Sequence, residues 1–419
     1  MKRRIAALAL AAAMTLTLCG AGVLAAEDQD TETGETAQDP AGTVTYTNLE
    51  RRLRENNSNL LSLEETIAAI QSTNYEALKD TLRDGLNQIA EAQWGLISMG
   101  SMMDSAMPGL GSAATSSSMQ SLQQTYDGLR DTFDDLKEGK LQAEHADLVR
   151  QLRSAQDQMV MGANALYITL VSLENTQVTV DRGLATLDRT IEEMELRHRL
   201  GQISALTLQD VKNNRTALES SRQTLLTNIR NCKMQLELMI GAELTGSIRL
   251  GDLPEVTAAQ LAEMDLEADL ETYLTASYDL YAAKKTLDDA EEDFKDAQKK
   301  HGYNTAWYEY QAAEHTVKAA RYTYTSTVQG AELRFRTLYY QVKDNAQVLE
   351  AARAALAGKE ADCAAMELKY SQGTISQNQL LTARDEVEEA RDKVVSAALD
   401  LFTNYNNYRW AVDHGILNG

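Results

Sequence analysis

The stretch Tyr370-Ser371-Gln372-Gly373-Thr374-Ile375-Ser376 separates two long apolar seams and decides the fold of the chain. On both sides of it, apolar residues recur at spacings of three and four across residues 349–401, with Lys359 as the one interruption. This spacing is typical of a coiled-coil seam. Glycine takes a positive φ at low cost at the end of a helix, and Ser376 is a favourable N-cap for the returning helix. The stretch therefore predicts an antiparallel helical hairpin that turns at Gly373.

The same hairpin occurs a second time, 172 residues earlier in the sequence. That shift places Gly201 on Gly373 and His198 on Tyr370, and it keeps the apolar residues of both arms in register. A long register without a gap indicates two tandem repeats of one helical unit. We therefore predict two tip turns, at Gly201 and Gly373.

Two seam positions are charged in the first repeat and apolar in the second. The first repeat has Arg215 and Arg222 where the second has Val387 and Val394. A charge on a seam indicates that the seam is partly wet or that it fixes register against a partner. The alternative is an ordinary interface from which the arginine stems extend into water.

The composition indicates an all-α, elongated protein. The 419 residues include three prolines and four phenylalanines, so little interrupts helix formation. Helices are expected over residues 47–97, 119–200, 203–240, 257–300 and 305–370, with a weak point at 131–139 and a loop at 100–118. The expected domains are a signal peptide at 1–26, a disordered acidic leader at 27–46, a first helical-hairpin repeat at 47–241, an inter-repeat linker at 242–256 and a second repeat at 257–416.

The first residues have the pattern of an export signal. Three basic residues precede the apolar run 5–18, and small residues near Ala25 and Ala26 suit cleavage there. A lipoprotein anchor at Cys19 is the alternative, although Leu18 is larger than the residue that usually precedes such a cysteine. The formal net charge of −22 argues against nucleic acid and against anionic lipid as partners.

No catalytic, metal or cofactor site is expected. The five histidines are scattered, and the sequence has neither a glycine-rich phosphate loop nor a nucleophile elbow. Cys232 and Cys363 fall on seam positions, where cysteine packs as a small hydrophobe; a disulfide between them is the alternative. No apolar run after the signal has the roughly 20 residues of a membrane-spanning helix.

The residues around the two glycines resemble those at the tip of TolC-type outer-membrane efflux proteins. The second copy carries the likeness most clearly in residues 370–375 with Leu380 and Ala383, and residues 196–203 are the weaker copy. The resemblance implies a homotrimer whose six hairpins form a hollow α-helical cylinder, a conduit for small molecules or polypeptides. It also implies an inner-membrane efflux pump and a periplasmic adaptor as partners, and a place in the cell envelope, in the outer membrane where the host has one.

One feature of that family is not evident in the sequence. Relatives usually insert pairs of membrane strands at the end opposite the glycine tip, and such strands need about 9 to 11 alternating residues. The available segments are 99–119 and 301–304, with a brief alternation at 321–328. We therefore expect little or no β-structure in this chain.

Besides the seam arginines, two groups of residues are candidates for function. His198 and Tyr370 are the last seam positions before the tip glycines, where they would constrict a pore; completion of the coiled-coil core is the alternative. Aromatic residues and methionines at the far ends of the repeats would contact lipid or a partner, or pack locally: Trp94, Met99, Met102, Met103, Met107, Tyr303, Trp307, Tyr308 and Tyr310. The leading hypothesis is an export conduit, and the alternative is an extracytoplasmic coiled-coil structural or adaptor protein without a pore.

Overall fold

The computed structural model describes residues 42–106, 110–301 and 305–417, which belong to one compact unit, Asp39–Gly419. The expected signal peptide and most of the acidic leader lie outside the described residues. The helices are α2 (Tyr46–Asn56), α3 (Ser58–Gln71), α4 (Tyr75–Ala106), α5 (Leu110–Lys137), α6 (Lys140–Arg199), α7 (Ala205–Met239), α8 (Ala258–Glu263), α9 (Leu266–Ala276), α10 (Tyr278–His301), α11 (Tyr308–Ser371) and α12 (Gln377–His414). The described β-structure consists of β1 (Thr43–Val44) and β2 (Arg249–Leu250), paired in parallel. The expected all-α class is confirmed.

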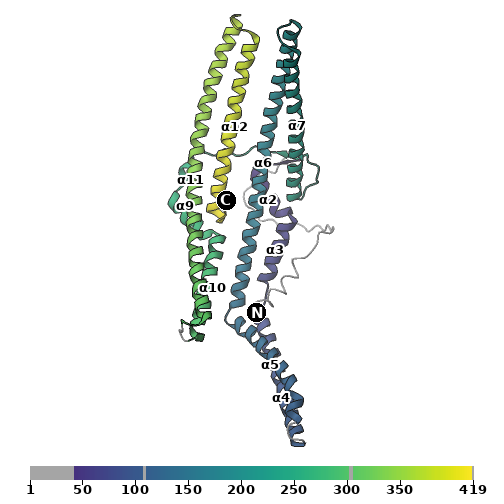
Figure 1. Ribbon diagram of the computed structural model, residues 1–419, viewed down its shortest axis with the longest axis vertical. Helices are drawn as coiled ribbons and strands as arrows, with labels where there is room; N and C mark the ends of the chain where they lie inside the picture. Colours follow the sequence, from purple (N-terminus) through teal and green to yellow (C-terminus); the bar gives the residue numbers. More distant parts are fainter. Residues whose placement is uncertain (1–41, 107–109, 302–304, 418–419) are drawn as a thin grey trace, which may run out of the picture. The chain divides into compact units, whose positions relative to one another are not determined.

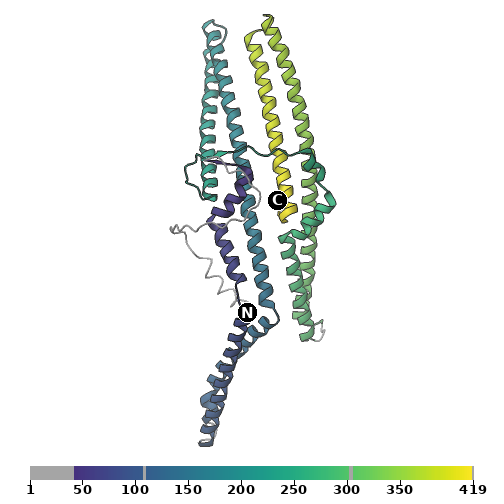
Figure 2. The same ribbon diagram turned by 180° about the vertical axis from the view of Figure 1, so that it is seen from behind.

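Two long antiparallel hairpins, α6–α7 and α11–α12, form the centre of the unit. They stand beside each other in the order α7, α6, α12, α11, with the two turns at the same end (Figures 1 and 2). Each hairpin has its own apolar core at the end away from its turn. One core surrounds Tyr167 and Leu236, and the other surrounds Phe335 and Tyr408.

Short helices pack against the lower parts of both hairpins, and both sets bend at a single residue. Asn57 is the C-cap of the 11-residue helix α2, and Ser277 is the C-cap of the 11-residue helix α9. The Asn57 side chain accepts hydrogen bonds from the first turn of α3 and donates one to the carbonyl of Met239 at the end of α7. The bend therefore satisfies helix ends that would otherwise lack partners.

A glycine at the end of each returning helix lies against these bends. Gly241 and Gly415 both have φ of +67°. A Cβ atom at Gly241 would come within 3.0 Å of Asn56, and one at Gly415 would overlap the backbone of Ala276. Both positions thus require glycine for its backbone angle and for its lack of a side chain.

The expected leader is wrong at its C-terminal end, since Val44 in β1 is fully buried and Thr43 pairs with Arg249. The loop before β2 is held by Glu237, whose carboxylate accepts hydrogen bonds from the backbone N–H groups of Gly246, Ser247 and Ile248. Burial favours the neutral carboxyl, but these bonds outweigh it and lower the pKa of Glu237. The expected 242–256 linker is therefore tied to the first repeat.

Three expected elements differ from the structure. Residues 47–97 contain α2, α3 and part of α4, and residues 257–300 contain α8, α9 and most of α10, because caps such as Asn57 and Asp265 interrupt the helix. The expected loop at 100–118 is helical over its described residues. There Gly100 and Thr115 are buried, so α4 and α5 pack closely enough to offset the low helix propensity of Gly and Ser.

The segments considered for strands, 99–119 and 321–328, are helical over their described residues. The expected weak point at 131–139 is confirmed, because Gly139 takes a φ of +78° between α5 and α6. Within the described ranges, none of the helices combines the length and the apolar character that crossing a membrane requires.

Candidate functional site: the hairpin tips and the polar contact between the hairpins

The two tip turns have the same backbone geometry. Gly201 (φ +72°) and Gly373 (φ +70°) each donate an N–H to the carbonyl three residues earlier, at 2.9 Å. The N–H groups of Gln202 and Thr374 reach the carbonyls five residues earlier. This is the Schellman pattern, in which glycine takes the left-handed position at the end of a helix. Ser204 and Ser376 then cap α7 and α12, so the local sequence determines both turns.

His198 and Tyr370 occupy matched places one turn before the glycines. Their carbonyls accept the glycine N–H bonds, and both side chains are exposed, Tyr370 by 42%. The His198 Nδ1 atom lies 3.2 Å from the carbonyl oxygen of Ile203, across its own turn. Within one chain these side chains therefore do not complete a buried core. Their role as a pore constriction remains a prediction.

Ion pairs tie the two arms of each hairpin together near the tip. Lys212 on α7 lies 2.7 Å from Glu195 on α6, and the repeat-equivalent Arg384 on α12 lies 2.8 Å from Glu367 on α11. The hydrogen bond from Lys212 lowers the pKa of Glu195. Both repeats thus keep one basic residue of the returning helix against one acidic residue of the outgoing helix.

The seam charges of the first repeat follow the same rule farther from the tip. Arg215 contacts Asp188 and Arg222 contacts Asp181, each at 2.5 Å, with all four side chains between 31 and 50% exposed. The hydrogen bond from Arg215 lowers the pKa of Asp188. The arginines therefore bind acidic residues of their own hairpin on a partly wet seam.

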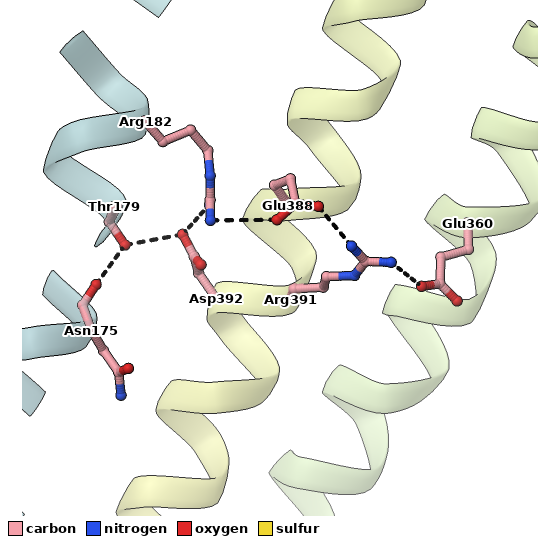
Figure 3. Close-up of polar contacts among 7 residues, drawn as sticks. All are labelled: Asn175, Thr179, Arg182, Glu360, Glu388, Arg391 and Asp392. Carbon is pink, nitrogen blue, oxygen red and sulfur yellow. Dashed lines mark hydrogen bonds and ion pairs between the residues drawn. The ribbon is translucent and has the colours of Figure 1, made fainter. Parts of the chain in front are cut away.

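A second set of charges joins the two hairpins to each other. Arg182 on α6 lies 2.6 Å from Asp392 and 3.4 Å from Glu388 on α12, and Arg189 lies 2.6 Å from Asp385. The Thr179 hydroxyl also donates to Asp392, at 3.0 Å. Figure 3 shows the contacts that Arg182 and Thr179 of α6 make with α12. These contacts fix the axial register of α6 relative to α12.

The network continues from α12 to α11. Glu388 accepts a hydrogen bond from Arg391 at 2.7 Å, and Arg391 also reaches Glu360 of α11 at 3.0 Å (Figure 3). Exposed and half-exposed pairs contribute between 0 and about 1 kcal/mol each. The network therefore specifies the register of α6, α12 and α11 more than it stabilises them.

Sequence reasoning missed these inter-hairpin residues, although a signal was present. Arg182 and Arg189 are seven residues apart, as are Asp385 and Asp392, so each pair repeats on one helix face with opposite charge. The apolar seam lies on one face of α6, and these charges lie on the opposite face.

The described residues offer no alternative chemistry at the tips. Among residues 42–106, 110–301 and 305–417, no group of three or more His, Cys, Asp or Glu side chains could hold a metal ion. Cys232 and Cys363 are half-buried free thiols, as their seam positions predicted. The arrangement can order helices and present two turns side by side.

Comparison with known proteins agrees with this architecture. No protein-family model matches the chain, and no curated protein matches it in sequence. The structure is similar to that of the outer-membrane channel OprN, with 12% sequence identity over 88% of this chain and 90% of that one and a TM-score of 0.52. The chain has a TolC-like fold.

Two further solved structures resemble the chain over most of its length. A membrane protein from Pseudomonas aeruginosa gives a TM-score of 0.48, with 13% identity over 87% of this chain and 90% of that one. CusC, described as forming a transmembrane channel, gives 0.47, with 13% identity over 88% and 96%. In this chain Gly201 lies in the turn between α6 and α7, and Gly373 lies in the turn between α11 and α12.

Proposed function

We propose that the chain is the protomer of a trimeric, extracytoplasmic α-helical conduit for small molecules or polypeptides. In this assembly three copies place six hairpins side by side around a lumen, with the glycine turns at one end. An inner-membrane pump supplies energy and an adaptor docks the conduit to it, as the resemblance implies. The protein itself performs no catalysis.

The order of the four long helices is the observation that supports a ring. Helix α6 contacts α7 through the seam that includes Leu184, and it contacts α12 through Arg182, two residues earlier and about 200° around the helix. Helix α12 likewise lies between α6 and α11 (Figures 1 and 2). The helices therefore form a row, and a row with matching edges can close on itself.

The two edges of the row are repeat equivalents of the contact at its centre. On α11, Ala354 and Ala361 occupy the places that Arg182 and Arg189 have on α6. On α7, Asn213 and Ser220 occupy the places of Asp385 and Asp392. All four edge residues are exposed. We infer that α11 of one copy packs against α7 of the next as α6 packs against α12, without the ion pairs.

Cysteine cross-linking tests this ring. In a chain with Cys232→Ala and Cys363→Ala, Ala354→Cys and Ser220→Cys should form disulfides between copies under mild oxidation. Denaturing gels should then show dimers and trimers and nothing larger, because three links close the ring. Ala355→Cys in place of Ala354→Cys is the matched control, since it is exposed but points about 100° away.

Two outcomes would contradict the proposal. Cross-linked species that grow beyond trimers would indicate an open assembly. Only monomers, with mass photometry agreeing, would favour the coiled-coil structural or adaptor protein without a pore.

The tip residues have a separate test. We propose that His198 and Tyr370 of the three copies constrict the lumen near the tips. If so, His198→Ala with Tyr370→Ala should raise the conductance of the trimer in planar bilayer or vesicle-flux measurements. Conductance equal to that of the unchanged protein in a correctly cross-linked trimer would remove these residues from the gate and leave the conduit intact.

A further inference from the structure

The end of the α4–α5 hairpin is almost free of charge in a strongly acidic chain. Charged residues make up 24% of the sequence, yet Asp104 is the single one between Glu91 and Asp127. This stretch covers the last part of α4 and the first part of α5. A solvated helical hairpin would be expected to carry charges on its outward faces.

The charged residues stop at nearly the same level along α4 and α5. The Gln93 side chain donates to that of Gln123 across the hairpin at 3.1 Å, so these two residues lie level. Glu91 stands two residues below that level on α4, and Asp127 stands four residues below it on α5, where it accepts from Gln123. The boundary therefore crosses the hairpin as a plane rather than following one helix face.

Large apolar side chains are exposed beyond this boundary. Trp94 is 71% exposed, Ile97 51%, Met99 48% and Met102 73%. Taking 100° per residue, Trp94 and Ile97 lie on one side of the face that α4 turns toward α5, and Met99 and Met102 lie on the other. Together the four side chains span about 200° of the surface of α4, which is wider than a single groove of a protein partner would cover and suits contact with a fluid apolar phase.

Aromatic residues stand at the edge of the uncharged region. Trp94 is next to Gln93 on α4, and the half-buried Tyr126 precedes Asp127 on α5. Trp and Tyr are enriched where protein passes from water into a lipid interface, because each has an apolar body and a polar tip. Asp104 and the many Ser and Gln side chains suit the hydrated headgroup level rather than the acyl interior.

We propose that the α4–α5 end binds the surface of a neutral lipid membrane, with its exposed apolar side chains at the boundary between headgroups and acyl chains. The acidic chain disfavours anionic lipid, and the uncharged end removes that repulsion locally. The end of α10–α11 is different: Lys299 and Lys300 pair with Asp296 and Glu309 there, so it keeps its charges. The proposal does not depend on the conduit.

Vesicle flotation tests the proposal directly. The chain without residues 1–26 retains every described residue and should float with phosphatidylcholine vesicles. Floating should decrease when one fifth of the lipid is phosphatidylglycerol. Ile97→Glu with Met102→Glu should reduce the bound fraction at least tenfold, because each charge must stay in water.

Matched variants distinguish lipid contact from a general effect of added charge. Tyr322→Glu with Leu333→Glu introduces the same charges at positions on α11 that are 75% and 68% exposed, and should leave flotation unchanged. In a Trp307→Phe chain, brominated lipid should quench the fluorescence of Trp94, and Trp94→Phe should abolish that quenching.

Several results would overturn the proposal. These are absence of flotation with neutral vesicles, an equal loss in the α11 control, or unquenched Trp94 in the bound state. Loss of self-association in Ile97→Glu/Met102→Glu, with flotation retained, would assign this surface to a second copy of the chain.

Discussion

The hairpins α6–α7 and α11–α12 have the same type of turn but differ in how close to that turn their buried residues begin. Both tips use a positive-φ glycine, a serine cap and one ion pair between the arms. On α12 the buried residues begin at Leu380, four residues after the cap, and continue through Val387 and Ala390. On α7 the first buried residue is Ile229, twenty-five residues after the cap.

Charge replaces apolar contact in the upper part of the first hairpin. Arg215 and Arg222 hold Asp188 and Asp181 where the second hairpin packs Val387 and Val394. Such partly exposed pairs are worth less than buried aliphatic side chains. The backbone turn is therefore the constant feature, and the first hairpin should open locally at lower free energy than the second.

The largest predicted loss of stability comes from the glycines at the ends of the two hairpins that lie away from the tip turns. Gly415→Ala should lower the free energy of unfolding by about 3 kcal/mol or more, because its left-handed φ is unfavourable for alanine and its Cβ would overlap the Ala276 backbone. Gly241→Ala should cost about 2 kcal/mol, since its closest contacts are at 3.0 Å. Urea denaturation followed by circular dichroism measures both.

Two other glycines calibrate this measurement. Gly373→Ala adds a Cβ with nothing within 4 Å, so it should show the backbone cost alone, about 1 kcal/mol. Gly358→Ala lies in the middle of α11 with open space around it and should stabilise by about 0.5–1 kcal/mol. A Gly415→Ala protein as stable as Gly373→Ala would contradict the close contact at the bend.

The sequence predicted the tips because their chemistry is local. Gly201, Gly373 and their serine caps lie within one short segment each, so the turn does not depend on the rest of the chain. The 172-residue repeat also predicted which helices correspond. The half-buried cysteines likewise followed from the periodicity of the seams.

The elements that sequence reasoning missed depend on distant partners. The strand at Thr43–Val44 has two residues and exists because β2, more than 200 positions later, pairs with it. Helix continues through the Gly- and Ser-rich part of α4 because α5 packs against it. The Arg182–Asp392 contact joins the two repeats, and the seven-residue charge spacing on each helix did not by itself indicate that α6 and α12 are neighbours.

A smaller effect follows from moving the charged seam of the first hairpin into the second. Val394→Arg should cost about 2 kcal/mol, because it places a charge on a half-buried seam and Arg353 stands where Asp181 stands in the first repeat. Adding Arg353→Asp should recover about 1 kcal/mol by recreating the Arg222–Asp181 pair. Denaturation midpoints of the double-mutant cycle give this coupling.

The control for this cycle is Arg222→Val in the first hairpin. It introduces the residue of the second repeat and should change stability by less than about 1 kcal/mol, because the pair it removes is partly exposed. A coupling near zero between Val394→Arg and Arg353→Asp would mean that the two seams are not equivalent in geometry.

The smallest effect concerns a titrating group at the lower end of the second hairpin. His414 on α12 lies 3.4 Å from Asp157 on α6 and stacks on Trp410, and Arg54 on α2 contacts the same carboxylate at 3.2 Å. The hydrogen bond with Asp157, opposed by burial, raises the pKa of His414. Burial alone would raise the pKa of Asp157, but its hydrogen bonds with His414 and Arg54 outweigh burial and lower that pKa.

The sign of the pH dependence follows from these directions. A raised pKa in the folded chain means that protonated His414 contributes its full stabilisation below about pH 6.5, and that this contribution is lost as pH rises through the folded pKa. Asp157 stays ionised throughout that range, because its lowered pKa lies on the acidic side. Between pH 6 and 9 the unchanged protein should therefore lose at most about 1 kcal/mol of stability, and His414→Gln should not show this loss. Thermal unfolding at several pH values measures the difference between the two proteins.

Asp157→Asn is the control and should also abolish this loss of stability, since it deletes the group that raises the pKa of His414. Parallel pH profiles for all three proteins would show that His414 does not titrate against Asp157.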